Sequence, residues 1–477
     1  MLNNQVFRTV RLPVGGEMHK QAGFASILLI LFIGLALTTL VIGMVTSVRG
    51  LQGSSLTTHA QTQAQIKSAI GYQALSEFLG PLSAAQIATI NNGTINGADT
   101  VATYTAVTTD CPAEAGGTKY FCYDIKAVSG GASSIVRATY ASKTTGAGSF
   151  TGSIFAGGLR KDGSATLGGD QTIAVKGDKV VDNQNDAIPE SALGGLTLDV
   201  FDPNVTFLKA EDLTADANYI FYKNGTCARN NLANISYIEG GVTKYKDITS
   251  QEPVACNDIS SGISGGTGNW NISGSQTLPV GVLWFEGNVN ITLSSAKAFV
   301  NTIIATGNIA VNLPNPTGNT DYFSYAPNHY YLLNPNNNRL TRVCGLNNSL
   351  VSLEPRPTQY CNADGTLKDM TTSPANIANI LFLSNGYLSL DSAGGRNGAE
   401  VNYYGNMLSG SLAGGTGNSS GDFRGGGTVN VYGNLVVTGA VQTSLLGNLN
   451  LQLKRGTSGG NTVPSKKVMI LSGLRYM

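Results

Sequence analysis

Charged residues are scarce in this chain. They make up 12% of its 477 residues and the formal net charge is +1, so the composition gives no reason to expect a nucleic acid partner. The three histidines (His19, His59 and His329) are too scattered to complete a zinc site, and no CxxC or HExxH motif occurs. We therefore expect neither a zinc site nor a metalloprotease.

Common catalytic motifs are also missing or lie in the wrong context. No GxxxxGK[ST] phosphate loop occurs, and the GxSxG strings "GISGG", "GNSSG" and "GTSGG" lie in Gly/Ser-rich stretches without the strand-to-helix turn of a nucleophile elbow. A carboxylate pair of the glycosidase type stays open, because sequence does not give the geometry of such a pair. We expect a non-enzymatic protein with no catalytic residues. The alternative is a membrane-tethered β-helix enzyme acting on carbohydrate, or a carbohydrate-binding protein.

The six cysteines fall into three sequential pairs, which are Cys111 with Cys122, Cys227 with Cys256, and Cys344 with Cys361. An even count at local spacings, in a chain with an export signal, predicts disulfides formed in an oxidising compartment. Six cysteines allow fifteen connectivities, and proximity alone favours this one.

Glycine is abundant, with 60 residues, and many of these glycines precede asparagine and a short apolar segment. "GNWNI" begins at Gly268, "GNVNI" at Gly287 and "GNIAV" at Gly307, so the spacing is 19 and then 20 residues. This period is too short for helical-pair repeats and is typical of a solenoid coil made of short strands. The sequence predicts a parallel β-helix over residues 144–477, with a β-sandwich or jelly roll as the competing fold.

The N-terminal region has a different pattern. The run from Phe24 to Val48 has no charged residue and is long enough to span a bilayer, while Arg8, Arg11 and Lys20 precede it and favour a cytoplasmic N-terminus. Apolar residues then recur four apart at Ile66, Ile70, Ala74 and Phe78, which predicts that the helix continues with one apolar stripe until Gly80 and Pro81.

Three alternating segments follow this helix, within 101–107, 120–128 and 135–142. Alternation of apolar and polar residues is typical of strands with one buried face, so we expect a small antiparallel sheet over residues 81–143, on which the helix buries its stripe. The whole chain is thus predicted to be mainly β, with one long N-terminal helix.

The leader "MHKQAG" with Lys20 and Gly23, followed by Phe24 and an apolar helix, resembles a type IV prepilin. Together with the strands, the resemblance covers residues 18–143 and is to PilX-like minor pilins and pilus assembly proteins. It implies that a prepilin peptidase cuts after Gly23 and removes a leader of residues 1–23, shortened to residues 18–23 if the chain starts at Met18. It implies further that Phe24 becomes the methylated N-terminus. It also implies that the helix over residues 24–80 is retained, anchors the chain in the inner membrane, and later packs against other pilins in an extracellular filament.

One position departs from the family's pattern. Most pilins carry a glutamate five residues into the mature chain, where this chain has Leu28. The loss of that carboxylate resembles certain minor pilins, including some at a filament tip. The resemblance therefore implies a special subunit that primes assembly or mediates adhesion.

Two further stretches are candidate sites. A non-periodic insertion over residues 311–378 contains Tyr322, Tyr325, Tyr330 and Tyr331, which either form an adhesion surface for host or surface glycans or pack the insertion onto the solenoid. The acidic stretch "DKVVDNQND" places Asp182, Asn185 and Asp186 close enough to hold calcium, unless it is a solvated loop. At the chain end, "KKVMILSGLRYM" is expected to form a strand that caps the solenoid.

Overall fold

The computed structural model describes most of the chain. The described residues are 22–79, 87–97, 100–113, 119–145, 152–201, 207–274, 278–294, 297–313, 320–334, 338–347, 355–391, 399–414, 420–457, 460, 462–464 and 466–477. They form two compact units, one made of residues 1–143 and 469–477 and the other of residues 144–468. We call the first the helix-sheet unit and the second the β domain. The predicted mainly β fold with a long N-terminal helix is confirmed.

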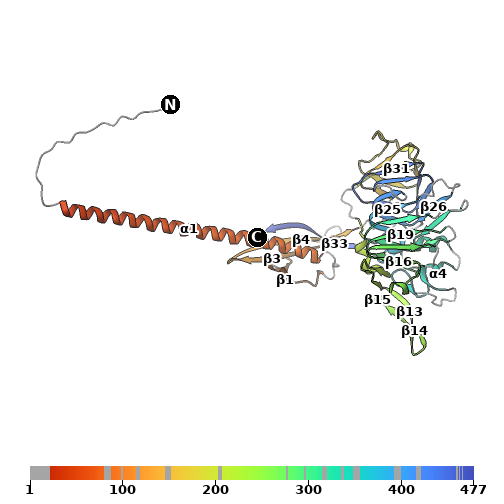
Figure 1. Ribbon diagram of the computed structural model, residues 1–477, viewed down its shortest axis with the longest axis horizontal. Coiled ribbons are helices and arrows are strands. Elements are labelled where there is room, and N and C mark those ends of the chain that lie inside the picture. Colours follow the sequence, from red (N-terminus) through yellow and green to blue (C-terminus); the bar gives the residue numbers. More distant parts are fainter. Residues whose placement is uncertain are drawn as a thin grey trace. The chain divides into compact units, whose positions relative to one another are not determined.

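Within the described residues, the helix-sheet unit contains α1 (Ala22–Leu79) and the strands β1 (Asn92–Gly97), β2 (Thr100–Val107), β3 (Lys119–Ser129), β4 (Ala132–Thr145) and β33 (Lys466–Tyr476). The sheet order is β1-β2-β3-β4-β33, and β1 to β4 pair antiparallel (Figure 1). Alternation in β3 turns Tyr123, Ile125 and Ala127 into the core, as the sequence pattern predicts.

The last strand, β33, belongs to this sheet and not to the β domain. It lies beside β4, where the backbone N–H of Met477 donates to the carbonyl of Ile135 at 3.0 Å and the hydroxyl of Ser472 donates to the carbonyl of Thr139 at 3.1 Å. Leu471 packs against the same core as α1. The expected solenoid cap at the chain end is therefore wrong: β33 pairs with β4 of the small sheet, and the β domain ends at residue 468.

The β domain is built from ladders of short parallel strands stacked on one another (Figure 1). In stacking order the first ladder contains β10 (Thr197–Val200), β8 (Thr172–Val175), β5 (Gly152–Phe155), β30 (Leu435–Val437), β27 (Asn406–Gly414), β25 (Ile380–Leu390), β21 (Thr302–Ala305), β18 (Val282–Phe285) and β11 (Tyr219–Phe221). A branch from β25 contains β22 (Ile309–Asn312), β19 (Asn288–Thr292) and β17 (Asn269–Ser273).

Two further parallel ladders complete the coils. One contains β20 (Phe299–Val300), β23 (Tyr322–Tyr325), β26 (Glu400–Tyr404), β29 (Thr428–Tyr432), β32 (Asn450–Lys454) and β7 (Thr166–Gly169), and the other contains β28 (Asp422–Gly425), β31 (Thr443–Gly447), β6 (Leu159–Lys161) and β9 (Val180–Val181). Parallel stacking of this kind is what a solenoid requires, whereas β-sandwiches pair their strands antiparallel. Large apolar residues fill the interior, including Phe155, Phe285, Trp270 and Phe423.

The stacking does not follow the chain order. In chain order the first three strands of the first ladder are β5, β8 and β10, which run from the middle of the ladder to one end. The chain then forms β11 at the other end of the parallel strands. From β11 the coils return through β18, β21, β25 and β27 to β30, which pairs with β5. The chain therefore enters and leaves the β domain at neighbouring coils.

Glycine and asparagine serve two roles at the coil corners. A Cβ atom on Gly287 would lie 2.2 Å from the carbonyl oxygen of Gly268 in the coil below, so only glycine lets these backbones approach. The asparagines that follow bond from coil to coil: the Asn288 side-chain amide donates to Asn269 at 3.1 Å, and Asn288 in turn accepts from the backbone N–H of Asn308 at 2.9 Å. The repeated Gly-Asn pair is thus a stacking device.

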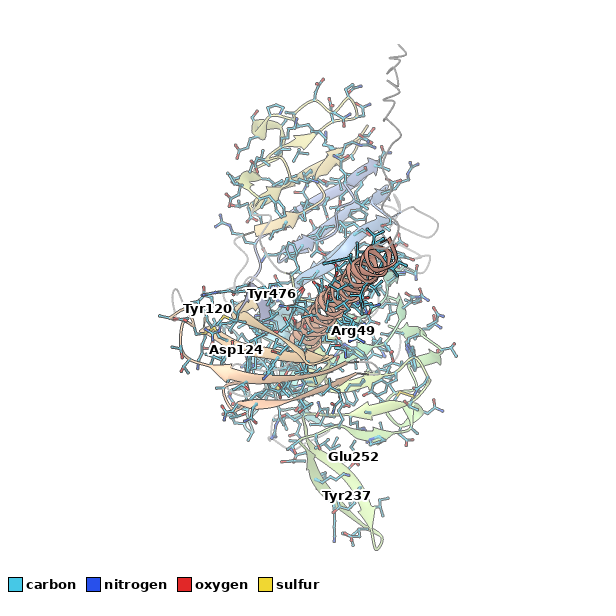
Figure 2. All side chains as sticks on the ribbon, turned by 90° about the vertical axis from the view of Figure 1, so that its left-hand side faces the viewer. Arg49, Tyr120, Asp124, Tyr237, Glu252 and Tyr476 are labelled. Carbon is cyan, nitrogen blue, oxygen red and sulfur yellow. A yellow bond between two sulfur atoms is a disulfide. The ribbon has the colours of Figure 1, made fainter. Side chains whose placement is uncertain are left out.

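The remaining elements cover the end and flank of the coils. Three antiparallel strands extend the parallel ladders: β12 (Cys227–Arg229) pairs with β11, β15 (Glu252–Val254) pairs with β12, and β16 (Ile263–Gly266) pairs with β17. Strands β13 (Leu232–Glu239) and β14 (Val242–Ile248) pair as an exposed hairpin that carries Tyr237, and β24 (Arg356–Pro357) joins its base (Figure 2). The helices of the β domain are α3 (Pro327–Leu333), α4 (Asn338–Cys344), η1 (Glu190–Ala192), η2 (Ala210–Asp216), η3 (Cys256–Asp258) and η4 (Ala375–Asn379).

Candidate functional sites on the long helix and the insertion

The residues expected at the processing site lie at the start of α1. Gly23, Phe24 and Leu28 fall inside the helix, which begins at Ala22, but their side chains lie outside the described residues. The leader up to residue 21 also lies outside them. Cleavage after Gly23 and the consequence of Leu28 stay predictions from sequence.

The first half of α1 is an exposed apolar rod. From Leu29 to Leu56 the large apolar side chains are about half or more exposed, with Leu51 at 68% and Leu56 at 70%. The helix is long and apolar enough to cross a membrane, which makes it compatible with a membrane anchor. Arg49, the first charged residue after the apolar run, lies on this exposed helix (Figure 2).

The second half of α1 packs on the sheet with a face that differs from the predicted one. Ile66, Ile70 and Phe78 are 54%, 44% and 52% exposed, so the predicted stripe does not face the sheet. The buried positions are Ala64, Ser68, Gly71, Leu75 and Leu79. At 3.6 residues per turn, Ile66 lies about 160° from Ser68 and Ile70 about 100° from Gly71 around the helix, so Ile66 and Ile70 lie off the buried face.

Small side chains explain why this other face is buried. A Cβ atom at Gly71 would lie 3.0 Å from Ala102 Cβ and 3.0 Å from Ile125 Cγ2, so the helix backbone lies almost against the sheet. Ser68 adds a hydroxyl contact of 3.2 Å to Ser134. Leu75 and Leu79 on the same face of the helix are buried in the core that it shares with the sheet.

All three sequential disulfides are formed. Cys111–Cys122 ties the segment after β2 to β3, Cys227–Cys256 ties β12 to η3, and Cys344–Cys361 closes the insertion after α4. The described chain contains no free cysteine. This pairing matches the one that proximity favours.

The four tyrosines of the insertion do not form one surface. Tyr322 is fully buried and Tyr330 is 6% exposed, while Tyr325 and Tyr331 are half-buried. The assignment of Tyr322 to an adhesion surface is wrong, because β23 is a regular coil strand whose alternation turns Tyr322 and Ser324 inward and Phe323 and Tyr325 outward. Within the described part of the insertion, the segment after β23, with α3 and α4, departs from the coil.

Sequence reasoning missed a stacked row of tyrosines on the ladder that contains β23, β26 and β29. The rings of Tyr325, Tyr404 and Tyr432 stack face to face, with centroids 4.6 Å and 4.3 Å apart, and the Lys454 ammonium lies 5.0 Å from the Tyr432 ring centre. Burial between its neighbours raises the pKa of Tyr325 above its ordinary value. The signal was present in the sequence, because "YGN" occurs at both Tyr404 and Tyr432 and marks the same coil position.

The acidic stretch around Asp182 forms a turn. Asp182 Oδ1 accepts the backbone N–H groups of Gln184 and Asp186, both at 2.9 Å, and Asn185 has a φ of 66°. No group of three or more acidic, histidine or cysteine side chains that could hold a metal is found among the described residues. Asp182 therefore has a structural role in closing this turn.

Comparisons with known proteins add little to this picture. The chain matches no protein-family model and no curated protein. Among solved structures it is similar to the competence-associated pilin ComZ from Thermus thermophilus, over 89% of this chain and 97% of that chain, with 10% identity and a TM-score of 0.26. A TM-score of 0.26 does not establish a shared fold, so function has to be inferred from this chain's own residues.

Proposed function

We propose that this chain is a non-enzymatic minor pilin or pilus assembly protein of a type IV pilus-like system. In this proposal it is located at the filament tip, where it primes assembly or mediates adhesion. Its partners are other pilins, contacted through α1, and a prepilin peptidase that cuts after Gly23. Before assembly it is held in the inner membrane with its N-terminus cytoplasmic, and afterwards it is part of an extracellular pilus.

The observation that carries the proposal is that α1 has two apolar faces and uses only one of them. The small-residue face around Gly71 is covered by the sheet, while Ile66, Ile70 and Phe78 remain exposed. The apolar rod of the first half of the helix ends at Leu56, ten residues before Ile66. A bilayer of about 30 Å covers only about 20 helical residues, so the stripe beyond Arg49 needs a protein partner. Packing against the helices of neighbouring pilins would cover both segments.

The size of the β domain supports a place at the tip. It spans residues 144–468 and is inserted between β4 and β33 of a five-stranded sheet. A filament subunit has neighbours on all sides, and a domain this much larger than the small sheet would crowd them. A subunit at the end of a filament has space on its free side.

Mass spectrometry of the mature N-terminus in sheared surface filaments tests the proposal. We expect the chain to be present in the sheared fraction and to begin at Phe24, and Gly23→Leu to leave the leader attached in the membrane fraction. Absence from the filaments, with membrane-bound chain still beginning at Met1 or Met18, would contradict a pilin role. Polysaccharide hydrolysis or cleavage by the purified chain would contradict the non-enzymatic part.

The exposed stripe can be tested by a matched pair of helix variants. Ile70→Lys places a charge on the stripe, whereas Gln65→Lys places one on an exposed position away from it. Because both sites are exposed, neither change should alter the fold of the helix-sheet unit. We expect Ile70→Lys to lose incorporation into filaments and Gln65→Lys to retain it. Equal incorporation of both variants would show that the stripe is not an assembly surface.

A further inference from the structure

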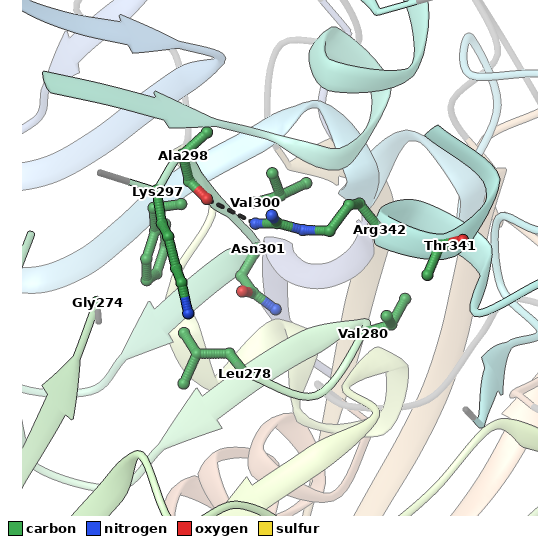
Figure 3. A pocket seen from close by; sticks show the side chains of 10 residues that line it. Gly274, Leu278, Val280, Lys297, Ala298, Val300, Asn301, Thr341 and Arg342 are labelled. Carbon is green, nitrogen blue, oxygen red and sulfur yellow. Dashed lines mark hydrogen bonds between the residues drawn. The ribbon is translucent and has the colours of Figure 1, made fainter. Parts of the chain in front are cut away.

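A pocket of about 220 Å³ opens on the flank of the β domain, between the corner of the coil that precedes β20 and helix α4 of the insertion (Figure 3). Its floor is apolar, formed by Leu278, Val280, Phe299 and Val300, of which the last three are buried. Two cationic side chains, Lys297 and Arg342, stand at its walls. Among its described lining residues no carboxylate occurs, so both charged side chains of the lining are cations.

The guanidinium of Arg342 is held in place before any ligand arrives. One of its Nη atoms donates to the carbonyl oxygen of Ala298 at 2.5 Å (Figure 3). Its Cζ lies 5.7 Å from the ring centre of Tyr330. Tyr330 in turn packs edge-on against Tyr325 at 5.3 Å, the first ring of the stacked tyrosine row. The bond to Ala298 is the only hydrogen bond of this guanidinium within the described part of the chain, so other N–H groups remain for a ligand.

Lys297 and Asn301 also line the pocket. Lys297 is exposed, and its side chain extends toward Leu278 across the pocket floor (Figure 3). The side-chain amide of Asn301 is fixed by donating to the carbonyls of Pro279 at 2.9 Å and Gly281 at 3.2 Å. The pocket thus combines a guanidinium and an ammonium group with an apolar floor.

We propose that this pocket binds a hexuronate-type sugar, a six-membered ring that carries one carboxylate. Guanidinium groups bind carboxylates through paired N–H donors, which places the anion at Arg342, in a pocket whose lining holds Lys297 as a second cation. The C–H face of the ring then packs on the apolar floor. A cavity this size is below the usual range for drug-sized ligands, about 300–1,000 Å³, and fits one terminal sugar rather than a polymer segment. This inference deepens the adhesion part of the proposed function and rests on it only for its biological role.

Titration of the full chain in detergent micelles with glucuronate, glucose and acetate, followed by saturation-transfer NMR, tests the proposal. We expect saturable binding of glucuronate, at least tenfold weaker binding of glucose, and no competition by acetate at equal concentration. Arg342→Gln and Lys297→Gln should each weaken glucuronate binding by roughly tenfold, because each removes a charge-assisted contact. Lys176→Gln, an exposed lysine outside the pocket, should leave it unchanged.

The outcomes separate the alternatives. Glucose binding as tightly as glucuronate would overturn the assignment, as would unchanged binding in Lys297→Gln, an exposed position whose substitution should not disturb the fold. Acetate competing as well as glucuronate would assign the pocket to free carboxylates and overturn the sugar assignment. The titration uses the purified chain, so its failure would leave the filament role standing. Absence of the chain from sheared filaments would likewise leave the pocket assignment standing.

Discussion

The β domain should lose stability on mild acidification because of one buried histidine. His329, in α3, is fully buried, and neither ring nitrogen has a hydrogen-bond partner among the described residues. Burial lowers the pKa of His329 from its ordinary value of 6.5 to about 4. The neutral ring is tolerated in the core, whereas the charged ring would be buried without a counter-charge.

The sign and size of the effect follow from proton linkage. Between pH 6.5 and pH 4 the unfolded chain binds a proton at His329 that the folded chain does not, so the free energy of unfolding falls as the pH falls. Integrating over these two pKa values gives a loss of about 2 kcal/mol between pH 7 and pH 5. Most carboxylates titrate below pH 5, so the loss of stability between pH 7 and pH 5 is assigned to His329.

Urea unfolding at pH 7 and pH 5 measures this loss. The only two tryptophans of the chain, Trp270 and Trp284, are buried in the β domain, so their fluorescence reports this unit alone. In His329→Leu the difference between the two pH values should shrink by about 2 kcal/mol, because the group that binds the proton is gone. His59→Gln, at an exposed position on α1, should behave like the unchanged chain.

Two results would refute this reasoning. One is a His329→Leu variant that keeps the full loss of stability between pH 7 and pH 5. The other is a pKa near 6 for the His329 ring, followed by its ring-proton NMR signal in the folded chain. Either would mean that the ring reaches water or a partner in solution.

Three further changes should affect stability in ways that the packing dictates. Gly71→Leu should destabilise the helix-sheet unit by about 1–3 kcal/mol, seen as faster amide exchange in β2, because the new side chain meets Ala102. Gln171→Leu should cost the β domain about 2 kcal/mol in urea unfolding, since the buried amide that donates to the Gly433 carbonyl at 2.6 Å is lost. Tyr404→Ala should cost about 1–3 kcal/mol in the same assay, whereas Tyr404→Phe should change little, because it keeps the stacked ring. A Tyr404→Phe loss equal to that of alanine would show that the hydroxyl, not the stack, matters.

Patterns that depend on neighbours in sequence predicted the local structure well. The alternation around Tyr123 placed the core face of β3, the cysteine spacing gave all three disulfides, and the steps between Gly268, Gly287 and Gly307 match strands that stack directly. In each case the physical cause lies within one strand or between adjacent coils.

Features set by long-range packing could not be predicted in the same way. The sequence pattern favours the stripe through Ile66 and Ile70, yet the sheet contacts the face around Gly71, where the helix backbone lies close to Ala102 and Ile125. The pocket at Arg342 likewise joins α4 to the corner near Lys297, about 45 residues earlier in the chain. Hydrophobic periodicity gives no information about such contacts.

The order of the coils explains how a large domain can be inserted in a small sheet. If the coils stacked in chain order, the chain would enter at one end of the β domain and leave at the other, and β33 could not easily return to β4. Instead β5 pairs with β30, and the seam between them is closed by Ser153, whose hydroxyl accepts the backbone N–H of Leu435 at 3.0 Å and donates to Gln171 at 2.9 Å. The two crossing points of the chain therefore lie at adjacent coils. The seam makes the insertion compatible with an intact five-stranded sheet, and so with the helix face that the filament proposal requires.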